Sequence, residues 1–169
     1  MSLGTGVPFE SPLSYQGAPS RRAAKNLPSA ALFVRILYDY RAQGKFRLHD
    51  FVVMPDHFHV LLTVNRNISI ERAVQFIKGG FAYRAGKELG LGFPVWQKGF
   101  SEIRIKDGIA FEGARTYIRN NPVVKHLAPT ATEFPYSSAY PGFELDTPPQ
   151  GLKPDREWDG SIDMAEAIS

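Results

Sequence analysis

The chain has 169 residues, of which 43% are hydrophobic and 22% are charged. These values are typical of one globular domain with a buried core and exclude fibrous or wholly disordered proteins. The absence of cysteine excludes disulfides, thiolate nucleophiles and cysteine-ligated metals. No apolar run approaches the roughly 20 residues that span a bilayer, and the first residues lack the regions of a secretory signal. We therefore expect a cytoplasmic protein without a membrane partner.

The formal net charge of +3 conceals an uneven distribution along the chain. Residues 21–125 carry 18 Lys and Arg against 8 Asp and Glu, whereas residues 127–169 carry 2 against 8. A basic middle followed by an acidic tail favours contact between the middle and a polyanion such as nucleic acid. A solvated basic surface is the alternative interpretation.

The first half of the chain predicts an irregular segment, a helix and a hairpin. Residues 1–28 are rich in Gly, Pro and Ser and lack periodicity, so we expect them to be irregular. Apolar residues at helical spacing predict a helix over residues 29–43, which Gly44 ends. Residues 46–64 are typical of two strands, because a Pro-Asp turn at 55–56 interrupts them.

The second half predicts two more helices and a strand. An apolar stripe predicts a helix over residues 69–89, with Ser69 as its N-cap. Residues 100–106 alternate as a strand does, and residues 110–121 read as a helix that Pro122 ends. The acidic, proline-rich residues after 146 predict a flexible tail.

This order of elements predicts an α+β fold. We expect a ferredoxin-like antiparallel sheet with the helices packed on one face. The domain would span residues 29–145, between the irregular residues 1–28 and the tail at 146–169. Simple alternation in the first hairpin strand places Asp50 on one face of the sheet and His49 on the other.

The sharpest local signal is His57-Phe58-His59 on the second hairpin strand. Because side chains alternate along a strand, His57 and His59 project to the same side while Phe58 enters the core. Two imidazoles at this spacing can chelate one cation. Surface or hydrogen-bonded histidines without a metal are the alternative.

The last helix brings a second set of reactive residue types. Tyr117 and Asn121 are four residues apart and therefore share one helix face. Tyrosine can act as a covalent nucleophile, and an asparagine carbonyl is a hard oxygen ligand. Alternatively, Tyr117 only covers the sheet and Asn121 is a helix-end residue. Arg115 and Arg119 lie on a neighbouring stripe that could hold phosphates.

Several blocks together resemble one known family. They are Val-Met-Pro-Asp-His-Phe-His-Val-Leu-Leu at 53–62, Trp-Gln-Lys-Gly-Phe at 96–100 and Tyr-Ile-Arg-Asn-Asn-Pro-Val at 117–123, with Tyr-Ser-Ser at 136–138 beyond them. In order and spacing these blocks resemble the single-tyrosine HUH transposases, in the branch of REP-associated tyrosine transposases, over about residues 32–143. The resemblance implies an α+β domain that cleaves and rejoins single-stranded DNA beside hairpins through a 5′-phosphotyrosine, with Mg²⁺ or Mn²⁺ as cofactor.

The resemblance also implies roles for individual residues. His57 and His59 would be the paired histidines, Asn121 would complete the metal site, and Tyr117 would be the nucleophile. Trp96 and Tyr83 are candidates for stacking on a DNA base. Four basic residues match no family motif and are predicted to contact DNA from their charge alone: Lys78, Arg84, Arg115 and Arg119.

One departure from the family leaves alternatives open. The family has a strand before its first helix, and residues 1–28 show no recognisable counterpart, which favours a decayed DNA- or RNA-binding module as the alternative function. A phosphoesterase with paired His-x-Thr motifs is a third hypothesis, and the sequence contradicts it because Val60 and Leu61 follow His59 and no second motif occurs. Some relatives exchange the tyrosine helix between subunits, so a homodimer and a single chain both remain open.

Overall fold

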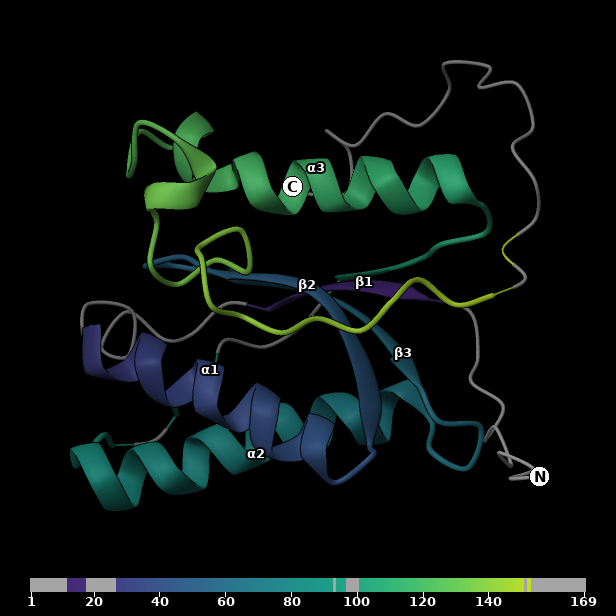
Figure 1. Cartoon of the computed structure of the whole chain (residues 1–169). Helices are drawn as coiled ribbons and strands as arrows, with labels where there is room; N and C mark the ends of the chain where they lie inside the picture. Colours follow the sequence, from purple (N-terminus) through teal and green to yellow (C-terminus); the bar gives the residue numbers. More distant parts are fainter. Residues whose placement is uncertain (1–11, 18–26, 93, 97–100, 151, 153–169) are drawn as a thin grey trace.

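The computed structural model describes residues 12–17, 27–92, 94–96, 101–150 and 152. A four-stranded antiparallel sheet lies at its centre, with helices on both sides (Figure 1). The predicted α+β class is therefore confirmed. In chain order the elements are β1 (Leu13–Gly17), α1 (Leu27–Ala42), β2 (Phe46–Val53), β3 (Phe58–Val64), α2 (Ile70–Leu89), β4 (Ser101–Arg104), α3 (Gly108–Val124) and a short 3-10 helix (Ala131–Glu133).

Strand β1 lies inside the sheet, whose strand order is β2-β3-β1-β4. Tyr15 pairs with Val60 of β3 on one side and with Glu102 of β4 on the other. The expectation that the first family strand is missing, and that residues 1–28 are irregular throughout, is therefore wrong at residues 13–17. Pro12 does not interrupt this strand, because it precedes β1 and contributes only its carbonyl, which accepts from the Ile105 amide at 2.9 Å.

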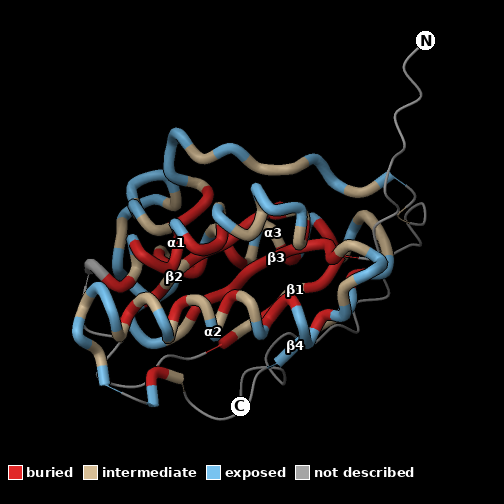
Figure 2. The backbone as a smooth tube through the Cα atoms, turned by 90° about the horizontal axis from the view of Figure 1, so that it is seen from below, coloured by how far each residue is buried: buried red, intermediate tan, exposed pale blue. Residues whose placement is uncertain are grey.

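The helices cover opposite faces of the sheet. In Figure 1, α1 and α2 lie below the sheet and α3 lies above it. One apolar core, which includes Phe33 and Phe58, lies between the sheet and helices α1 and α2. A second, which includes Leu61 and Ile118, lies between the sheet and α3. The prediction that all helices pack on one face is wrong, because α3 has an apolar stripe of its own that needs the free face. Figure 2 shows burial along β1 and β3 and exposure along β4.

A β-bulge in β2 changes which residues face α3. Leu48 pairs with Leu62 and Asp50 pairs with Leu61, so His49 is an extra residue in the ladder. The His49 ring contacts the Phe111 ring of α3, with centroids 5.3 Å apart. Asp50 also bonds to α3, so the two neighbours share a face and the predicted alternation is wrong at this point.

The segment that follows α3 returns along the outer edge of β2. The Val53 amide donates to the Tyr136 carbonyl at 2.9 Å, and the Asp146 amide donates to the Leu48 carbonyl at 2.8 Å. The Asp146 carboxylate also forms two hydrogen bonds with Arg41 of α1, at 2.8 and 2.9 Å. This segment covers the hydrogen-bonding groups of an edge strand. Residues 151 and 153–169 of the expected tail lie outside the described residues.

Two helix ends refine the sequence-based boundaries. Ser69 is the N-cap of α2, as predicted, and its hydroxyl accepts from the Arg72 amide at 3.2 Å. Helix α3 continues past Pro122 to Val124 instead of ending before the proline. The missing N–H of Pro122 removes one hydrogen bond near the last turn, which the helix tolerates here. None of the described helices is long and apolar enough to cross a membrane.

Candidate active site

Helix α3 carries Tyr117 and Asn121 to the sheet, and two features of the chain fix this helix locally. At its start, the Asp107 side chain caps the helix by accepting from the Ala110 amide at 2.8 Å. Along its length, an apolar stripe that includes Ile118 packs on β2 and β3. Tyr117 and Asn121 flank this stripe and face the histidine end of β3.

The Asn121 amide lies between the two imidazoles. Its Oδ1 atom is 3.3 Å from His57 Nε2, and its Nδ2 atom is 3.2 Å from His59 Nε2. The imidazole rings are almost perpendicular, at 82°, with centroids 4.9 Å apart. Three side chains from two distant parts of the chain thus point their polar atoms at one another, in the combination that the family resemblance implies.

Tyr117 completes the cluster. Its ring lies edge-on to the His59 ring, with centroids 5.2 Å apart and an interplanar angle of 80°. Burial raises the pKa of the Tyr117 phenol, and a hydrogen bond with the Asn121 side chain acts in the opposite direction. The phenol is therefore protonated at neutral pH, and all four predicted residues meet within one chain.

His59 is held in its neutral form. The side chain is 3% exposed, and desolvation, together with the charge of nearby His57, lowers its pKa to about 3. Its Nε2 atom therefore carries a lone pair at neutral pH, which accepts from the Asn121 amide nitrogen. A metal ligand needs this same lone pair.

Asp56 fixes the tautomer of His57. The carboxylate Oδ1 atom lies 2.6 Å from His57 Nδ1, which therefore carries the proton that it donates. The remaining nitrogen, Nε2, lies 3.3 Å from the Asn121 carbonyl oxygen. It donates to this oxygen when the ring carries two protons, whereas the neutral ring presents a lone pair that can ligate a metal. A carboxylate behind a ligating histidine is a common arrangement at metal sites.

The donor set therefore fits a divalent metal ion, although only two of its members are histidines. Among the described residues, no three His, Cys, Asp or Glu side chains come together as a potential metal site. The third ligand would be the amide oxygen of Asn121. Two imidazoles and one amide oxygen form a mixed nitrogen and oxygen set, which suits a borderline cation better than a purely hard one.

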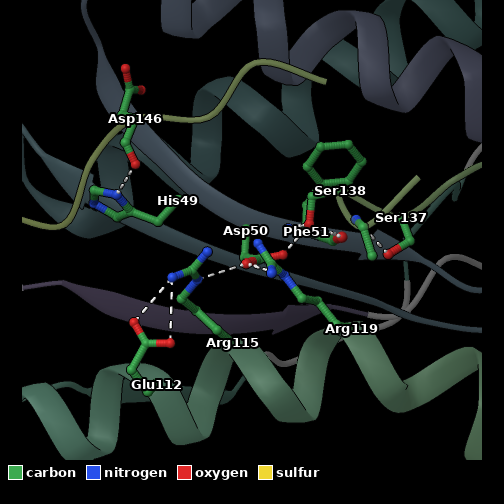
Figure 3. Close-up of polar contacts among 10 residues, drawn as sticks. His49, Asp50, Phe51, Glu112, Arg115, Arg119, Ser137, Ser138 and Asp146 are labelled. Atoms are coloured by element: carbon green, nitrogen blue, oxygen red, sulfur yellow. Dashed lines mark hydrogen bonds and ion pairs between the residues drawn. The ribbon is translucent and has the colours of Figure 1, made fainter. Parts of the chain in front are cut away.

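The four basic residues predicted to contact DNA lie in two places. Lys78 and Arg84 are on α2, across the sheet from Tyr117, and Arg84 bonds to Asp39 at 2.7 Å. Arg115 and Arg119 are on α3, and both donate to the carboxylate of Asp50 (Figure 3). The structure does not bring the four together on one surface.

Trp96 is partly buried against the core rather than an open stacking platform, whereas Tyr83 is 67% exposed on α2. Its ring contacts Phe33 and Phe58 at centroid distances of 5.9 and 5.5 Å. Its indole N–H donates to the Lys78 carbonyl at 2.8 Å. Trp96, the first residue of the second block, thus supports the histidine strand from behind, and residues 97–100 of that block lie outside the described residues.

Sequence reasoning missed two carboxylates near the site. The sequence pattern places Asp56 only in a turn, although its position next to His57 is a usable signal. Alternation places Asp50 only on a strand face, although a carboxylate directly before the apolar run Phe-Val-Val at 51–53 indicates a buried partner. The structure buries Asp50 completely and gives it three partners.

The fold and the site define an α+β domain that presents a helix-borne tyrosine to two histidines at the start of β3, His57 directly before the strand and His59 within it. A family model described as "Transposase IS200 like" matches residues 20–121. The chain belongs to this transposase family. No match was found among curated proteins.

Two solved structures share the fold. A REP-associated tyrosine transposase bound to a REP hairpin is 19% identical, with a TM-score of 0.65, and the match covers 81% of this chain and 81% of that one. A putative transposase from Deinococcus radiodurans R1 is 24% identical, with a TM-score of 0.50 over 71% of this chain and 97% of that one. The family match ends at Asn121, so the segment along β2 lies beyond it.

Proposed function

We propose that this chain is a metal-dependent single-stranded DNA endonuclease and strand transferase of the REP-associated tyrosine branch, with Tyr117 as its nucleophile. The observation that carries the proposal is the contact between Tyr117 and His59, whose ring centroids lie 5.2 Å apart within one chain. A catalytic tyrosine must reach the group that activates the phosphate, and here no partner subunit is needed for that contact. A homodimer remains an untested prediction.

The reaction is a transesterification that the tyrosine begins. The Tyr117 oxygen attacks the scissile phosphorus and forms a tyrosine–phosphate ester with the 5′ side of the break, while the bond from phosphorus to the 3′ oxygen breaks. The phenolic proton leaves during attack, and the departing 3′ oxygen ends as a hydroxyl. Because the ester keeps the energy of the broken phosphodiester bond, a 3′-hydroxyl can later reverse the step and rejoin DNA.

The chain's own residues prepare this step. Burial keeps His59 unprotonated, Asp56 orients His57, and Asn121 holds both imidazoles at one point. These three ligands would hold Mg²⁺ or Mn²⁺, and a bound divalent ion supplies Lewis-acid stabilisation of the phosphate oxygens. The mixed donor set favours Mn²⁺ over Mg²⁺.

The proposed substrate is single-stranded DNA next to a hairpin. The excess of Lys and Arg over residues 21–125 supports a nucleic-acid ligand. The structural relative bound to a REP hairpin supports hairpin DNA as the particular form. The basic residues on α2 and α3 remain predicted DNA contacts, with Arg115 and Arg119 already engaged by Asp50.

Covalent trapping tests the proposal. The protein is incubated with labelled, hairpin-flanked single-stranded DNA and Mn²⁺, and adducts are resolved on a denaturing gel. The parent chain should form an adduct that Tyr117→Phe abolishes. Tyr140→Phe is the matched control, because Tyr140 is 41% exposed beyond α3 and should react as the parent does.

The same experiment addresses the alternative of a decayed binding module. DNA binding by the parent chain without any adduct would support that module and contradict the enzyme. The sequence argument for decay was the missing first strand, and β1 occupies its place in the sheet. The fold therefore gives no reason to prefer the inactive alternative.

A further inference from the structure

Asp50 is a fully buried carboxylate that joins three distant parts of the chain. Its Oδ2 atom accepts from Nε of Arg115 at 3.1 Å and from Nε of Arg119 at 2.9 Å. Its other oxygen accepts from the hydroxyl of Ser138, which lies in the segment along β2. Figure 3 shows the two arginines reaching from α3 to this one side chain. We call these four residues the Asp50 joint.

Burying a charged carboxylate is an energetically unfavourable way to hold a helix in place. Asp50 is 0% exposed, and removing a carboxylate from water has a large free-energy cost unless its partners are well placed. Apolar residues of similar volume often stabilise such a position at least as well. The β-bulge at His49 is also needed to turn Asp50 towards α3. A role in fixing geometry therefore accounts for the joint better than a gain in stability.

The helix geometry connects the joint to the candidate active site. Arg115 and Arg119 are one turn apart on one flank of α3, whereas Tyr117 and Asn121 are one turn apart on the other. Each residue turns a helix by about 100°, so Tyr117 points about 200° away from the arginine on either side of it. A rotation of α3 that moves the arginines from Asp50 must also move the phenol and the amide.

We propose that Asp50 is a positioning residue that sets the rotation of α3 and thereby places Tyr117 and Asn121 against the two histidines. Two hydrogen bonds one turn apart on the helix converge on a single oxygen, which restricts both rotation and sliding of α3. Ser138 holds the carboxylate in the orientation that both arginines need. The effect on DNA cleavage rests on the function proposed above, whereas the effect on side-chain position does not.

The chain offers a matched control on the opposite side of β2. The Asp146 carboxylate bonds to Arg41 at 2.8 and 2.9 Å and accepts from the Leu48 amide at 2.8 Å. Like Asp50 it is a carboxylate paired with arginine, but it is 26% exposed, its single arginine comes from α1, and none of these partners comes from α3. Loss of Asp146 should weaken the fold without turning the tyrosine helix.

The experiment compares Asp50→Asn with Asp146→Asn in the full chain. An asparagine at position 50 has no negative charge to hold two guanidinium groups on one oxygen, and its Nδ2 replaces the oxygen that accepts from Ser138, so the contacts of both arginines are weakened. NMR should show that the cross-relaxation between the Tyr117 and His59 rings weakens in Asp50→Asn and persists in Asp146→Asn. With saturating DNA and Mn²⁺, adduct formation should slow about 100-fold in Asp50→Asn, the cost of a misplacement of about 1 Å.

The possible results separate this proposal from the proposed function. If the parent forms no adduct, the proposed function fails, and the ring contact in the two variants still decides the role of Asp50. An unchanged ring contact in folded Asp50→Asn would overturn the positioning role. If Asp50→Asn does not fold, Arg119→Gln replaces it, because Arg115 still neutralises Asp50. In Arg119→Gln the contact between the Tyr117 and His59 rings should be partly lost. Full retention of this contact would overturn the proposal.

Discussion

Replacing Gly17 by alanine should disturb the histidine strand from its opposite face. Gly17 ends β1 directly opposite Phe58. An added Cβ would lie 2.6 Å from ring atoms Cε1 and Cζ of Phe58. The ring has little room to retreat, because it is 1% exposed and its centroid is 4.4 Å from that of Phe33 and 5.5 Å from that of Trp96. Because Phe58 lies between the two histidines, its displacement also shifts them.

The magnitude follows from two opposing effects. Overpacking a core costs about 1–3 kcal/mol, and replacing glycine restricts the unfolded chain, which returns about 0.4–1 kcal/mol. The net loss in the free energy of unfolding is then about 1–2 kcal/mol for Gly17→Ala. At about 2–4 °C per kcal/mol for a chain of this size, thermal unfolding followed by circular dichroism should show a melting temperature lower by about 2–8 °C.

Gly79→Ala is the control for this measurement. An added Cβ at Gly79 meets nothing within 4 Å, and the residue lies inside α2. Alanine is favoured over glycine in a helix by about 1 kcal/mol, so the melting temperature should rise. A Gly17→Ala protein that melts at or above the temperature of the parent would refute the proposed packing of β1 against Phe58.

Three further changes test other parts of the account. Because the pKa of His59 is lowered to about 3, unfolding takes up a proton as the pH falls from about 6.5 to 3, and stability falls by up to about 1.4 kcal/mol per pH unit. His59→Gln should flatten the pH dependence of the urea midpoint between pH 7 and 5. His49, whose pKa is also lowered, contributes to this dependence in both proteins. An unchanged pH dependence in His59→Gln would contradict the lowered pKa of His59. Asp56→Ala should weaken Mn²⁺ binding about 10-fold in titration calorimetry, because it frees the tautomer of His57; equal affinity would argue against that role. Asp107→Ala removes the N-cap of α3 and should cost about 1 kcal/mol in denaturant unfolding, whereas an unchanged midpoint would show that the cap contributes nothing.

The helices were predictable from the sequence because their signals are local. The apolar stripe of α2 and its Ser69 cap lie within one stretch of chain, and the structure confirms both. The pairing of His57 with His59 followed from strand alternation for the same reason. Tyr117 and Asn121 could be placed on one helix face, but their meeting with the histidines came from the resemblance and not from spacing.

The errors occurred where long-range pairing determines local structure. Strand β1 has five residues, and its place in the sheet depends on pairing with β3 and β4, which lie far along the chain. The bulge at His49 leaves no mark in the sequence, yet it turns Asp50 towards α3. The partners of Asp50 therefore could not be predicted from alternation, which gave the wrong face.

The identity of the residue that bonds to DNA tests the central claim most directly. After reaction with hairpin-flanked single-stranded DNA and Mn²⁺, nuclease and trypsin digestion should release the peptide of residues 116–119, Thr-Tyr-Ile-Arg, because cleavage follows Arg115 and Arg119. Mass spectrometry should find a 5′-phosphonucleotide on Tyr117 in this peptide. An adduct on any other residue, or DNA cleavage that leaves this peptide unmodified while the reaction is under way, would contradict the account.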